Sequence, residues 1–348
     1  MVLVYRYRVK SLTGLLDRQA RAVNFVWNYC NDRQQDALKW GRRWLSGFDL
    51  NQLTAGSSKA LDIHSGTINA VCEQYARSRA QKRRPMLRYR GRRSLGWVPL
   101  KGRDLKREGD AFRFAGNTFR VFNSRPLPAG RIKDGTSFSC DARGRWYLNI
   151  ALEVAAAERA QQPERAVGID LGLKELAALS TGEKIANPRH VGTIEQRLAQ
   201  AQRARKRRQA AKLHARAAHA RRDFLHKLST RIVREFDYIA VGNVAAAGLA
   251  RTRLARSVLD AGWSSFRDML RYKAMAHGAW YAEVDERFST QTCSACGARG
   301  GPQGREGLVV RAWVCGSCGA LHDRDTNAAL NLLLRSGHRT PVQGIPAL

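Results

Sequence analysis

Four cysteines in the C-terminal third of the chain have the spacing of a metal-binding site. They form two Cys-x-x-Cys pairs, Cys293 with Cys296 and Cys315 with Cys318, and 18 residues separate the pairs. Each pair can present two thiolates from a tight turn, and two such turns complete a tetrahedron. The spacing is typical of zinc, with coincidence or a redox pair as the alternatives. The sequence therefore predicts a structural Zn²⁺ site, because four thiolates leave no open position for catalysis.

Two aspartates are candidate ligands of a catalytic metal. Asp170 follows an apolar segment and precedes Gly172, and Asp325 begins an apparent helix after the second cysteine pair. Carboxylates that converge on one edge of a sheet can hold two divalent ions about 3.5–4 Å apart, an arrangement that hydrolyses phosphodiesters. Mg²⁺ prefers such oxygen ligands. The simpler alternatives are a turn or surface position for Asp170 and a helix N-cap for Asp325, although Asp323 can also supply that cap.

The second half of the chain alternates between strand and helix patterns. Three short strands are predicted in 166–187, a long helical region in 193–236 and a buried strand in 238–244. An amphipathic helix (257–278) and a further strand (280–288) follow. This order is that of a ribonuclease-H-like α/β fold.

The first half has a different pattern. Residues 2–9 alternate apolar and basic, as a half-exposed strand does, and residues 14–42 and 48–80 have helical periodicity. From 95 to 153 the pattern returns to short strands joined by turns. We expect a small β-barrel or sheet with a helical insertion, ending at a polar boundary.

The charge of the chain indicates a polyanionic partner. There are 61 Lys and Arg against 29 Asp and Glu, a formal net charge of +32, so nucleic acid is the leading candidate. Basic residues are densest in 81–93 and 201–222, although such runs are often only solvated faces. The candidate nucleic-acid contacts are Arg83, Arg84, Arg88, Arg90, Arg205, Lys206, Arg207 and Arg208.

Hydropathy and cysteine usage predict a cytoplasmic protein. No apolar run approaches the roughly 18 residues of a membrane span, and the N-terminus lacks a secretory signal. Seven cysteines fit a reducing compartment, because four have zinc spacing. The other three, Cys30, Cys72 and Cys140, have no partner spacing and are predicted to be core or surface residues.

Several of these motifs, in this order, resemble the TnpB family of RNA-guided nucleases from insertion sequences, to which the type V CRISPR effectors are similar. The resemblance is carried by 168–172, 260–274, the two cysteine pairs and 322–333, and it is dense over about 164–335. It implies an α/β protein with a wedge-type β-barrel, an inserted helical recognition lobe, and a RuvC-like nuclease domain with an embedded zinc ribbon.

The resemblance also implies boundaries, ligands and partners. The barrel would comprise 1–12 and 83–158, the recognition lobe 13–82, the nuclease domain 164–290 and 320–335, the ribbon 291–319, and a flexible tail 336–348. Asp170 and Asp325 would bind catalytic Mg²⁺, with support from Asn327. The partners would be a structured guide RNA and target double-stranded DNA with a short flanking motif. A bacterial, nucleoid-associated protein is expected, with a monomer favoured.

The sequence departs from the family at one position. The family carries a catalytic Glu at the end of the fourth strand, where this chain has Gly242. Glu286 stands in the next strand pattern, where the family usually has Pro, and its periodicity places it beside Ala282 and Val284. We therefore predict that Glu286 replaces the missing ligand. The alternative is a surface acid paired with Arg287 or another basic residue.

The leading hypothesis is an RNA-guided, Mg²⁺-dependent DNA endonuclease that uses Asp170, Glu286 and Asp325. Three alternatives stay open: a nuclease-dead, RNA-guided DNA-binding protein, a small type V CRISPR effector, and a transposase that performs strand transfer itself.

Overall fold

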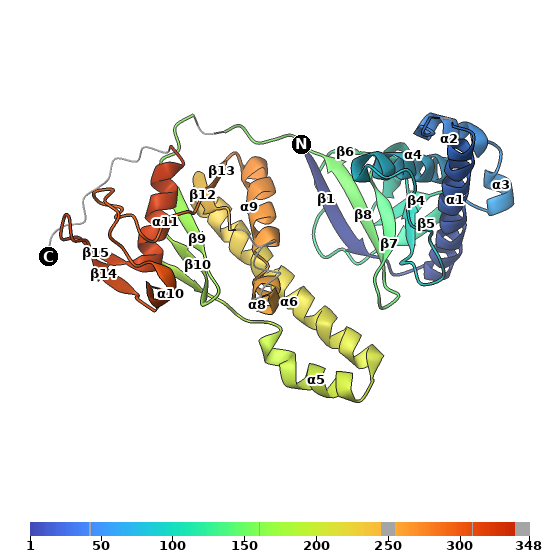
Figure 1. Cartoon of the computed structure of the whole chain (residues 1–348). Helices are drawn as coiled ribbons and strands as arrows, with labels where there is room; N and C mark the ends of the chain where they lie inside the picture. The colour runs from blue at the N-terminus through green and yellow to red at the C-terminus, as the bar shows by residue number, and fades with distance from the viewer. Residues whose placement is uncertain (42, 160, 245–254, 308, 338–348) are drawn as a thin grey trace. The chain divides into compact units, whose positions relative to one another are not determined.

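The computed structural model describes the chain except for residues 42, 160, 245–254, 308 and 338–348. The chain divides into two units, Met1–Ala155 and Ala156–Leu348 (Figure 1). The division falls at the start of the polar stretch that the sequence suggested as a boundary. Among the described helices, none is both long and apolar enough to cross a membrane. Nearly all of the predicted flexible tail lies outside the described residues.

The first unit contains two antiparallel sheets. One has the order β1-β8-β7-β2, with β6 also paired to β8, and the other has the order β3-β4-β5. The strands are β1 (Val2–Arg8), β2 (Trp97–Pro99), β3 (Lys106–Glu108), β4 (Ala111–Phe114), β5 (Asn117–Arg120), β6 (Arg131–Ile132), β7 (Ser137–Cys140) and β8 (Trp146–Glu153).

The predicted barrel is wrong in that the described strands do not close into a ring. The long strand β1 lies at one edge of the larger sheet, and the three-residue strand β2 lies at the other. β2 ends at Pro99, which has no N–H to donate to a further strand. The second sheet meets the first at a bridge between Val9 and Val121.

Four helices lie between β1 and β2 in the sequence. They are α1 (Thr13–Lys39), α2 (Gly47–Leu53), α3 (Ser58–Leu61) and α4 (Ser65–Lys82). Val23, Val26, Leu50, Val71 and Tyr75 belong to their shared buried core. α4 ends where Arg83 takes a left-handed conformation, and Pro85 then prevents the chain from resuming a helix.

The second unit is built on a mixed sheet with the order β11-β10-β9-β12-β13. β10 is antiparallel to β9 and β11, whereas β12 is parallel to β9 and β13. The strands are β9 (Ala166–Leu171), β10 (Glu175–Leu179), β11 (Lys184–Ala186), β12 (Tyr238–Gly242) and β13 (Trp280–Val284).

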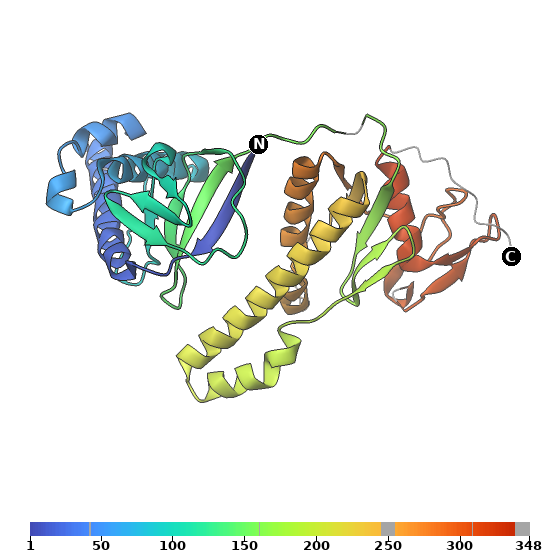
Figure 2. The ribbon, with the colours of Figure 1, turned by 180° about the vertical axis from the view of Figure 1, so that it is seen from behind.

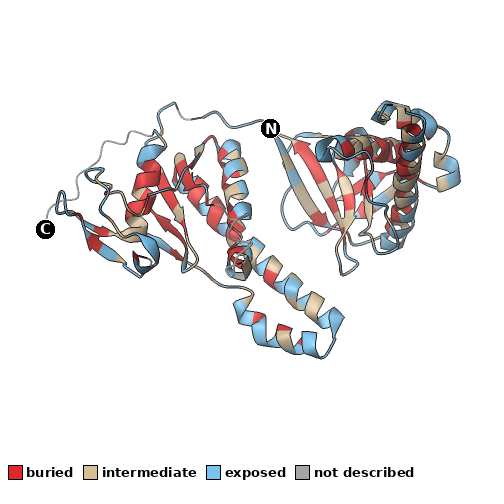
Figure 3. Cartoon of the chain, viewed as in Figure 1, coloured by how far each residue is buried: buried red, intermediate tan, exposed pale blue. Residues whose placement is uncertain are grey.

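Helices cover both faces of this sheet (Figures 1 and 2). Val167 and Ile169 of β9 point into a core shared with α6 and α9. Gly168, between them, points to the opposite face, where an added Cβ would collide with the carbonyl oxygen of Ala329 in α11. The absence of a side chain at Gly168 therefore lets α11 lie directly against the central strand. Figure 3 shows the buried residues on these facing surfaces.

The helices of the second unit differ from the sequence prediction in two places. They are α5 (Glu195–Arg203), α6 (Arg207–Glu235), α8 (Ala255–Ala261), α9 (Trp263–His277), α10 (Gly304–Gly307) and α11 (Arg324–Arg335). The long region 193–236 breaks between α5 and α6, where Arg205 has a φ of 52°. The region 257–278 breaks at Gly262, whose φ of 70° suits glycine.

Candidate acidic site and cysteine cluster

Asp170 lies near the carboxyl end of the central strand β9. Side chains alternate along a strand, so Asp170 points to the same face as Gly168, which is the face covered by α11. Ile169 pairs with Val241, which brings the next residue of each strand, Asp170 and Gly242, side by side. Ligands bind at this edge, outside the carboxyl ends of parallel strands, in open α/β sheets.

The space beside Gly242 is occupied by the carboxylate of Glu286. A Cβ built on Gly242 would lie 3.4 Å from Oε2 of Glu286 and 3.6 Å from its Cβ. The same Cβ would lie 3.2 Å from Leu332 of α11. The carboxylate of Glu286 therefore reaches the position that a side chain at residue 242 would enter.

Glu286 arrives there from a loop rather than from a strand. β13 ends at Val284, so the predicted strand 280–288 is too long. The loop is held to the end of β12, because the N–H of Asn243 donates to the carbonyl oxygen of Val284 at 2.9 Å. Arg287, the alternative ion-pair partner of Glu286, pairs instead with Asp285, at 3.6 Å.

Asp323, and not Asp325, caps helix α11. The Asp323 carboxylate accepts from the N–H of Thr326 at 3.0 Å and pairs with Lys184 at 2.6 Å. Asp325 therefore has no capping role. Its side chain is 16% exposed and accepts from Arg324 at 2.8 Å and from Arg311 at 3.3 Å. Neither arginine was identified from the sequence, because neither spacing nor periodicity marks them.

The charges of the other two acids act on Asp170. Burial, followed by the charges of Asp325 and Glu286, raises the pKa of Asp170 to about 8, and Arg324 opposes the shift. Burial also raises the pKa of Glu286. Carboxylates gathered in this way repel one another, and a divalent cation between them reverses that repulsion.

Asn327 does not support the acids as the sequence suggested. Its buried amide donates to the carbonyl oxygens of Ser289 and Thr292 and accepts from the N–H of Ser294 at 2.9 Å. Asn331, one turn later, donates to the same two carbonyl oxygens. Both residues therefore fasten the segment that enters the first cysteine pair to α11.

The four predicted cysteines come together. Their Sγ atoms all lie within 4.8 Å of one another, which fits a metal ion such as zinc. Each pair closes a tight turn: the N–H groups of Gly297 and Gly319 donate to the carbonyl oxygens of Cys293 and Cys315.

A short two-stranded sheet supports the second cysteine pair. β14 (Ala312–Val314) leads into Cys315, and β15 (Leu321–Asp323) returns beside it. The ring centroids of His322 in β15 and Trp313 lie 4.8 Å apart with the rings tilted by 38°, and Nε2 of His322 lies 3.0 Å from the Sγ of Cys293. A histidine that bonds to a metal-ligating thiolate from outside orients it. Sequence spacing gave no signal for His322.

The predicted nucleic-acid contacts fall in two places. Arg205, Lys206, Arg207 and Arg208 are exposed at the bend between α5 and α6. Arg83, Arg84 and Arg88 are exposed in the segment that follows α4. Arg90 differs, because it is half-buried and its guanidinium donates to Asn24 and to the carbonyl oxygen of Leu95.

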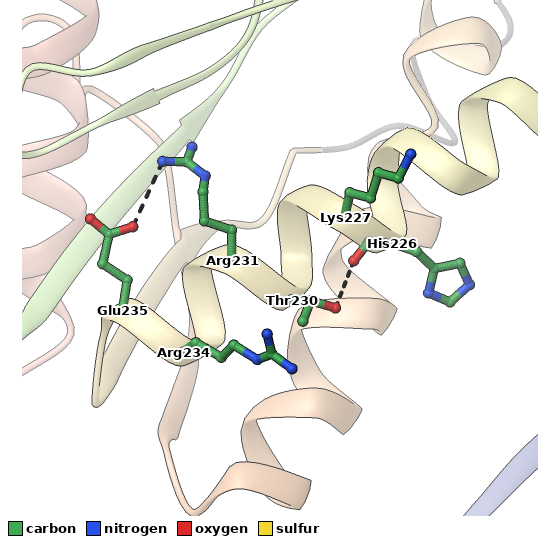
Figure 4. A pocket seen from close by; sticks show the side chains of 6 residues that line it. All are labelled: His226, Lys227, Thr230, Arg231, Arg234 and Glu235. Atoms are coloured by element: carbon green, nitrogen blue, oxygen red, sulfur yellow. Dashed lines mark hydrogen bonds and ion pairs between the residues drawn. The ribbon is translucent and has the colours of Figure 1, made fainter. Parts of the chain in front are cut away.

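A further basic surface on α6 is largely neutralised by acids. It is a groove of about 670 Å³ lined by His226, Lys227, Thr230, Arg231, Arg234 and Glu235 (Figure 4). Lys227 pairs with Asp223 at 2.7 Å, and Arg231 pairs with Glu183 at 2.8 Å. Positive residues alone therefore do not identify an anion-binding surface in this chain.

Two of the three remaining cysteines meet in the helical core. The Sγ atoms of Cys30 in α1 and Cys72 in α4 lie 3.7 Å apart, and both side chains are fully buried. Of the two expected positions, core or surface, both residues occupy the core, and their contact could not be predicted because they lie 42 residues apart in the sequence.

Two family models match the chain. The model described as "Cas12f1-like, TNB domain" covers residues 263–332, which include the cysteine cluster and Asp325. The OrfB_IS605 model, described as "Probable transposase", covers residues 149–253. The resemblance to the TnpB family is confirmed.

Curated relatives of the TnpB type extend the match. A Streptomyces pristinaespiralis protein named "Putative RNA-guided DNA endonuclease" is 42% identical over 224 residues, which are 60% of this chain and 54% of that protein. The chain thus matches about half the length of that relative. The Escherichia coli K12 protein InsQ, similarly named, is 27% identical over 80% of this chain and 79% of its own length.

A solved structure has a similar fold. The cryo-EM structure of a Cas12f1–sgRNA–target DNA complex matches with a TM-score of 0.60 at 11% identity, and the match covers 92% of this chain and 82% of that one. The shared fold is of mixed α/β type.

Proposed function

We propose that the chain is an RNA-guided, divalent-metal-dependent DNA endonuclease encoded by a transposable element. The observation that carries the proposal is the position of Glu286, whose carboxylate stands beside Gly242, where the TnpB family has its second acid. Together with Asp170 and Asp325 it gives three carboxylates at one edge of a sheet. That number and placement suit phosphodiester hydrolysis.

The acid cluster fits Mg²⁺. All three side chains offer hard oxygen donors, and the pKa of Asp170 is raised first by burial and then by the charges of Asp325 and Glu286. Asp170, Glu286 and Asp325 would hold the ions, which when bound activate water and stabilise charge on the scissile phosphate. Arg311 and Arg324 keep the Asp325 carboxylate oriented.

The cysteine cluster fits a structural Zn²⁺. Its four thiolates would fill a tetrahedral shell, so the ion would have no position for substrate. The bonds of Asn327 and Asn331 tie the entrance of the ribbon to α11, the helix that begins beside Asp325. The ribbon would therefore help to position one of the three acids.

The finer domain assignment is part of the proposal. The sheet order β11-β10-β9-β12-β13 is consistent with a ribonuclease-H-like, RuvC-type nuclease domain, and the first unit is consistent with an open wedge domain carrying a recognition lobe. The partners would be a structured guide RNA and target double-stranded DNA with a short flanking motif. This assignment draws on the Cas12f1 structure, in which that protein is bound to an sgRNA and target DNA.

Plasmid cleavage by the protein–RNA complex in Mg²⁺ tests the proposal. Wild type is compared with Asp170→Asn, Glu286→Gln and the control Asp285→Asn, which removes a neighbouring exposed charge. We expect guided cutting by wild type and the control, and a loss of at least about 100-fold in the first two variants. Guide RNA binding should stay unchanged in all four proteins.

The outcomes separate the alternatives. Cutting that persists in Glu286→Gln removes Glu286 from the site. Guided binding by wild type without cutting, together with cutting by Gly242→Glu, identifies a binding protein whose nuclease is inactive. Joining of transposon ends that depends on Asp170 identifies a strand-transferring transposase.

A further inference from the structure

One face of helix α1 holds the basic segment that follows α4. Asn24, Trp27, Asn28 and Asn31 follow an i, i+3, i+4, i+7 pattern, so their side chains share one face of the helix. All four contact the segment 83–93 through hydrogen bonds. This stripe is polar where a helix packed inside a domain is usually apolar.

Two of the asparagines bind the segment as a neighbouring β-strand would. Asn31 donates to the carbonyl oxygen of Leu87 at 2.8 Å and accepts from its N–H at 3.0 Å. Asn28 does the same with Arg90, at 2.8 Å in both directions. An asparagine amide has the donor and acceptor of a peptide group, so each pair satisfies one residue of the segment completely.

Arg90 anchors the segment from its own side. Its Nε donates to Asn24 at 2.6 Å, and its guanidinium lies 5.8 Å and 5.6 Å from the rings of Trp27 and Trp97. Burial lowers its pKa. Arg90 is therefore a positioning residue, and the sequence-based assignment of a nucleic-acid contact to it does not fit its surroundings.

Leu87 is buried in the helical core, whereas most other side chains of the segment are exposed. Tyr89 is 48% exposed, and its hydroxyl donates to Asp32 of α1 at 2.7 Å, which fixes the direction of the ring. The exposed arginines form no ion pair or side-chain hydrogen bond with the part of the chain that the structure describes, whereas Lys227 and Arg231 pair with Asp223 and Glu183. These arginines are Arg83, Arg84, Arg88, Arg92 and Arg93.

We infer that the segment 83–93 is a preorganised binding site for single-stranded nucleic acid. Unpaired guanidinium groups on a fixed backbone bind successive phosphates, and the ring of Tyr89 stacks on an unpaired base. A duplex does not offer that base, because its bases are already stacked. The hydrogen bonds to α1 hold the segment in one conformation before it binds, so less conformational entropy is lost when nucleic acid binds. This inference rests on the proposed function in taking nucleic acid as the partner.

Fluorescence anisotropy with the full chain tests the site, with Ca²⁺ replacing Mg²⁺ to prevent cutting. The probes are 15-nucleotide RNA and DNA strands of the same sequence, a strand made only of abasic sites, and a DNA duplex. Tyr89→Leu removes the ring, whereas Tyr89→Phe keeps the ring and loses only the bond to Asp32. Melting temperatures verify that the variants are folded.

We expect Tyr89→Leu to weaken single-strand binding by about fivefold or more and Tyr89→Phe to stay within about twofold. Wild type should bind the abasic strand more weakly than the other single strands. The Tyr89→Leu substitution should not reduce the affinity for the abasic strand any further. Arg88→Gln should lower the salt slope by about 0.7. If Tyr89→Leu weakens binding of the RNA strand alone, the site exists and is specific for RNA. If it weakens binding of both the RNA and the DNA strand, the site accepts either nucleic acid.

Three outcomes overturn the inference: unchanged single-strand affinity in a folded Tyr89→Leu protein, an equal loss on the abasic strand, or an equal loss on the duplex. None depends on cleavage. A complex that cuts guided DNA with Tyr89→Leu neutral would refute this site and leave the proposed function intact. A complex that does not cut guided DNA, but in which Tyr89→Leu weakens single-strand binding, would refute only the proposed endonuclease activity.

Discussion

At the scale of single residues, variants of Gly242 and Glu286 test whether one carboxylate has moved from the end of β12 to the loop that follows β13. The Cβ of Gly242→Glu would lie 3.4 Å from Oε2 of Glu286, and its carboxylate would enter the same space. We therefore expect repulsion and crowding to destabilise the protein by about 1–3 kcal/mol and to reduce cleavage. Combining it with Glu286→Ala removes that conflict and restores the family arrangement. The double variant should therefore cut better than either single variant.

Cleavage rates and urea unfolding of the four proteins form a double-mutant cycle. A coupling free energy near zero would show that the two positions do not share one site. Gly242→Ala is the steric control, because it adds the Cβ without a charge. It separates crowding against Leu332 from repulsion between two acids.

Asp323 and Asp325 should differ in the property that they control. Asp323→Ala removes the N-cap of α11 and the pair with Lys184, so we expect a stability loss of about 1 kcal/mol and a fall in Tm of about 2–4 °C. Cleavage should fall little in that variant. Asp325→Asn should abolish cleavage with a smaller change in Tm. Calorimetry and plasmid cleavage on both proteins measure this, and exchanged phenotypes would reverse the two assignments.

The residue scale also shows what the sequence could supply. Asp170, Asp325 and the four cysteines are predicted from motifs, and Glu286 is proposed because an acid stands near the position where the family's acid is missing. Arg311, His322 and the Cys30–Cys72 contact were not foreseeable, because side-chain direction and helix packing create them. Asn327 was misjudged for the same reason: a motif gives a position along the chain but not the direction of the amide.

At the scale of elements, strand and helix types were largely predicted and their ends were not. β13 ends before Glu286, and the region 193–236 breaks at Arg205. Neither break carries a Gly or Pro that would mark it. The prediction of a closed barrel is wrong because the sequence shows the alternation within each strand but does not show whether the outermost strands pair with each other. Gly168 was the informative signal that went unused, since its missing side chain admits α11.

The cysteine ribbon should behave as one element with the start of α11. We expect one zinc per chain, and we expect Cys315→Ser to lose the metal and to increase hydrogen exchange in α11. The coupling follows from Asn327 and Asn331, which bond to the segment entering the ribbon. Elemental analysis and exchange mass spectrometry measure both effects. Cys140→Ser, in the other unit, is the control. Loss of metal in that variant would show that the zinc content does not depend specifically on the four clustered cysteines.

At the scale of the whole molecule, the net charge of +32 predicts steep salt dependence, but the arrangement of charge determines which residues produce it. Arg207 and Arg208 at the α5–α6 bend are exposed and lack acidic partners in the described part of the chain. Lys227 and Arg231, farther along α6, pair with acids. Replacing either pair with Gln therefore removes the same formal charge, in one case from a surface without acidic partners and in the other from a surface whose basic residues are already paired.

We expect Arg207→Gln/Arg208→Gln to lower the slope of log Kobs against log salt by about 1.4–1.8, because up to two phosphate contacts are lost. Lys227→Gln/Arg231→Gln should leave the slope nearly unchanged, because counterions are not released by groups that are already paired. Anisotropy titrations of guide RNA between 50 and 200 mM KCl measure both slopes. Equal slopes in the two double variants would mean that overall charge, and not its arrangement on α6, sets the affinity of this protein for nucleic acid.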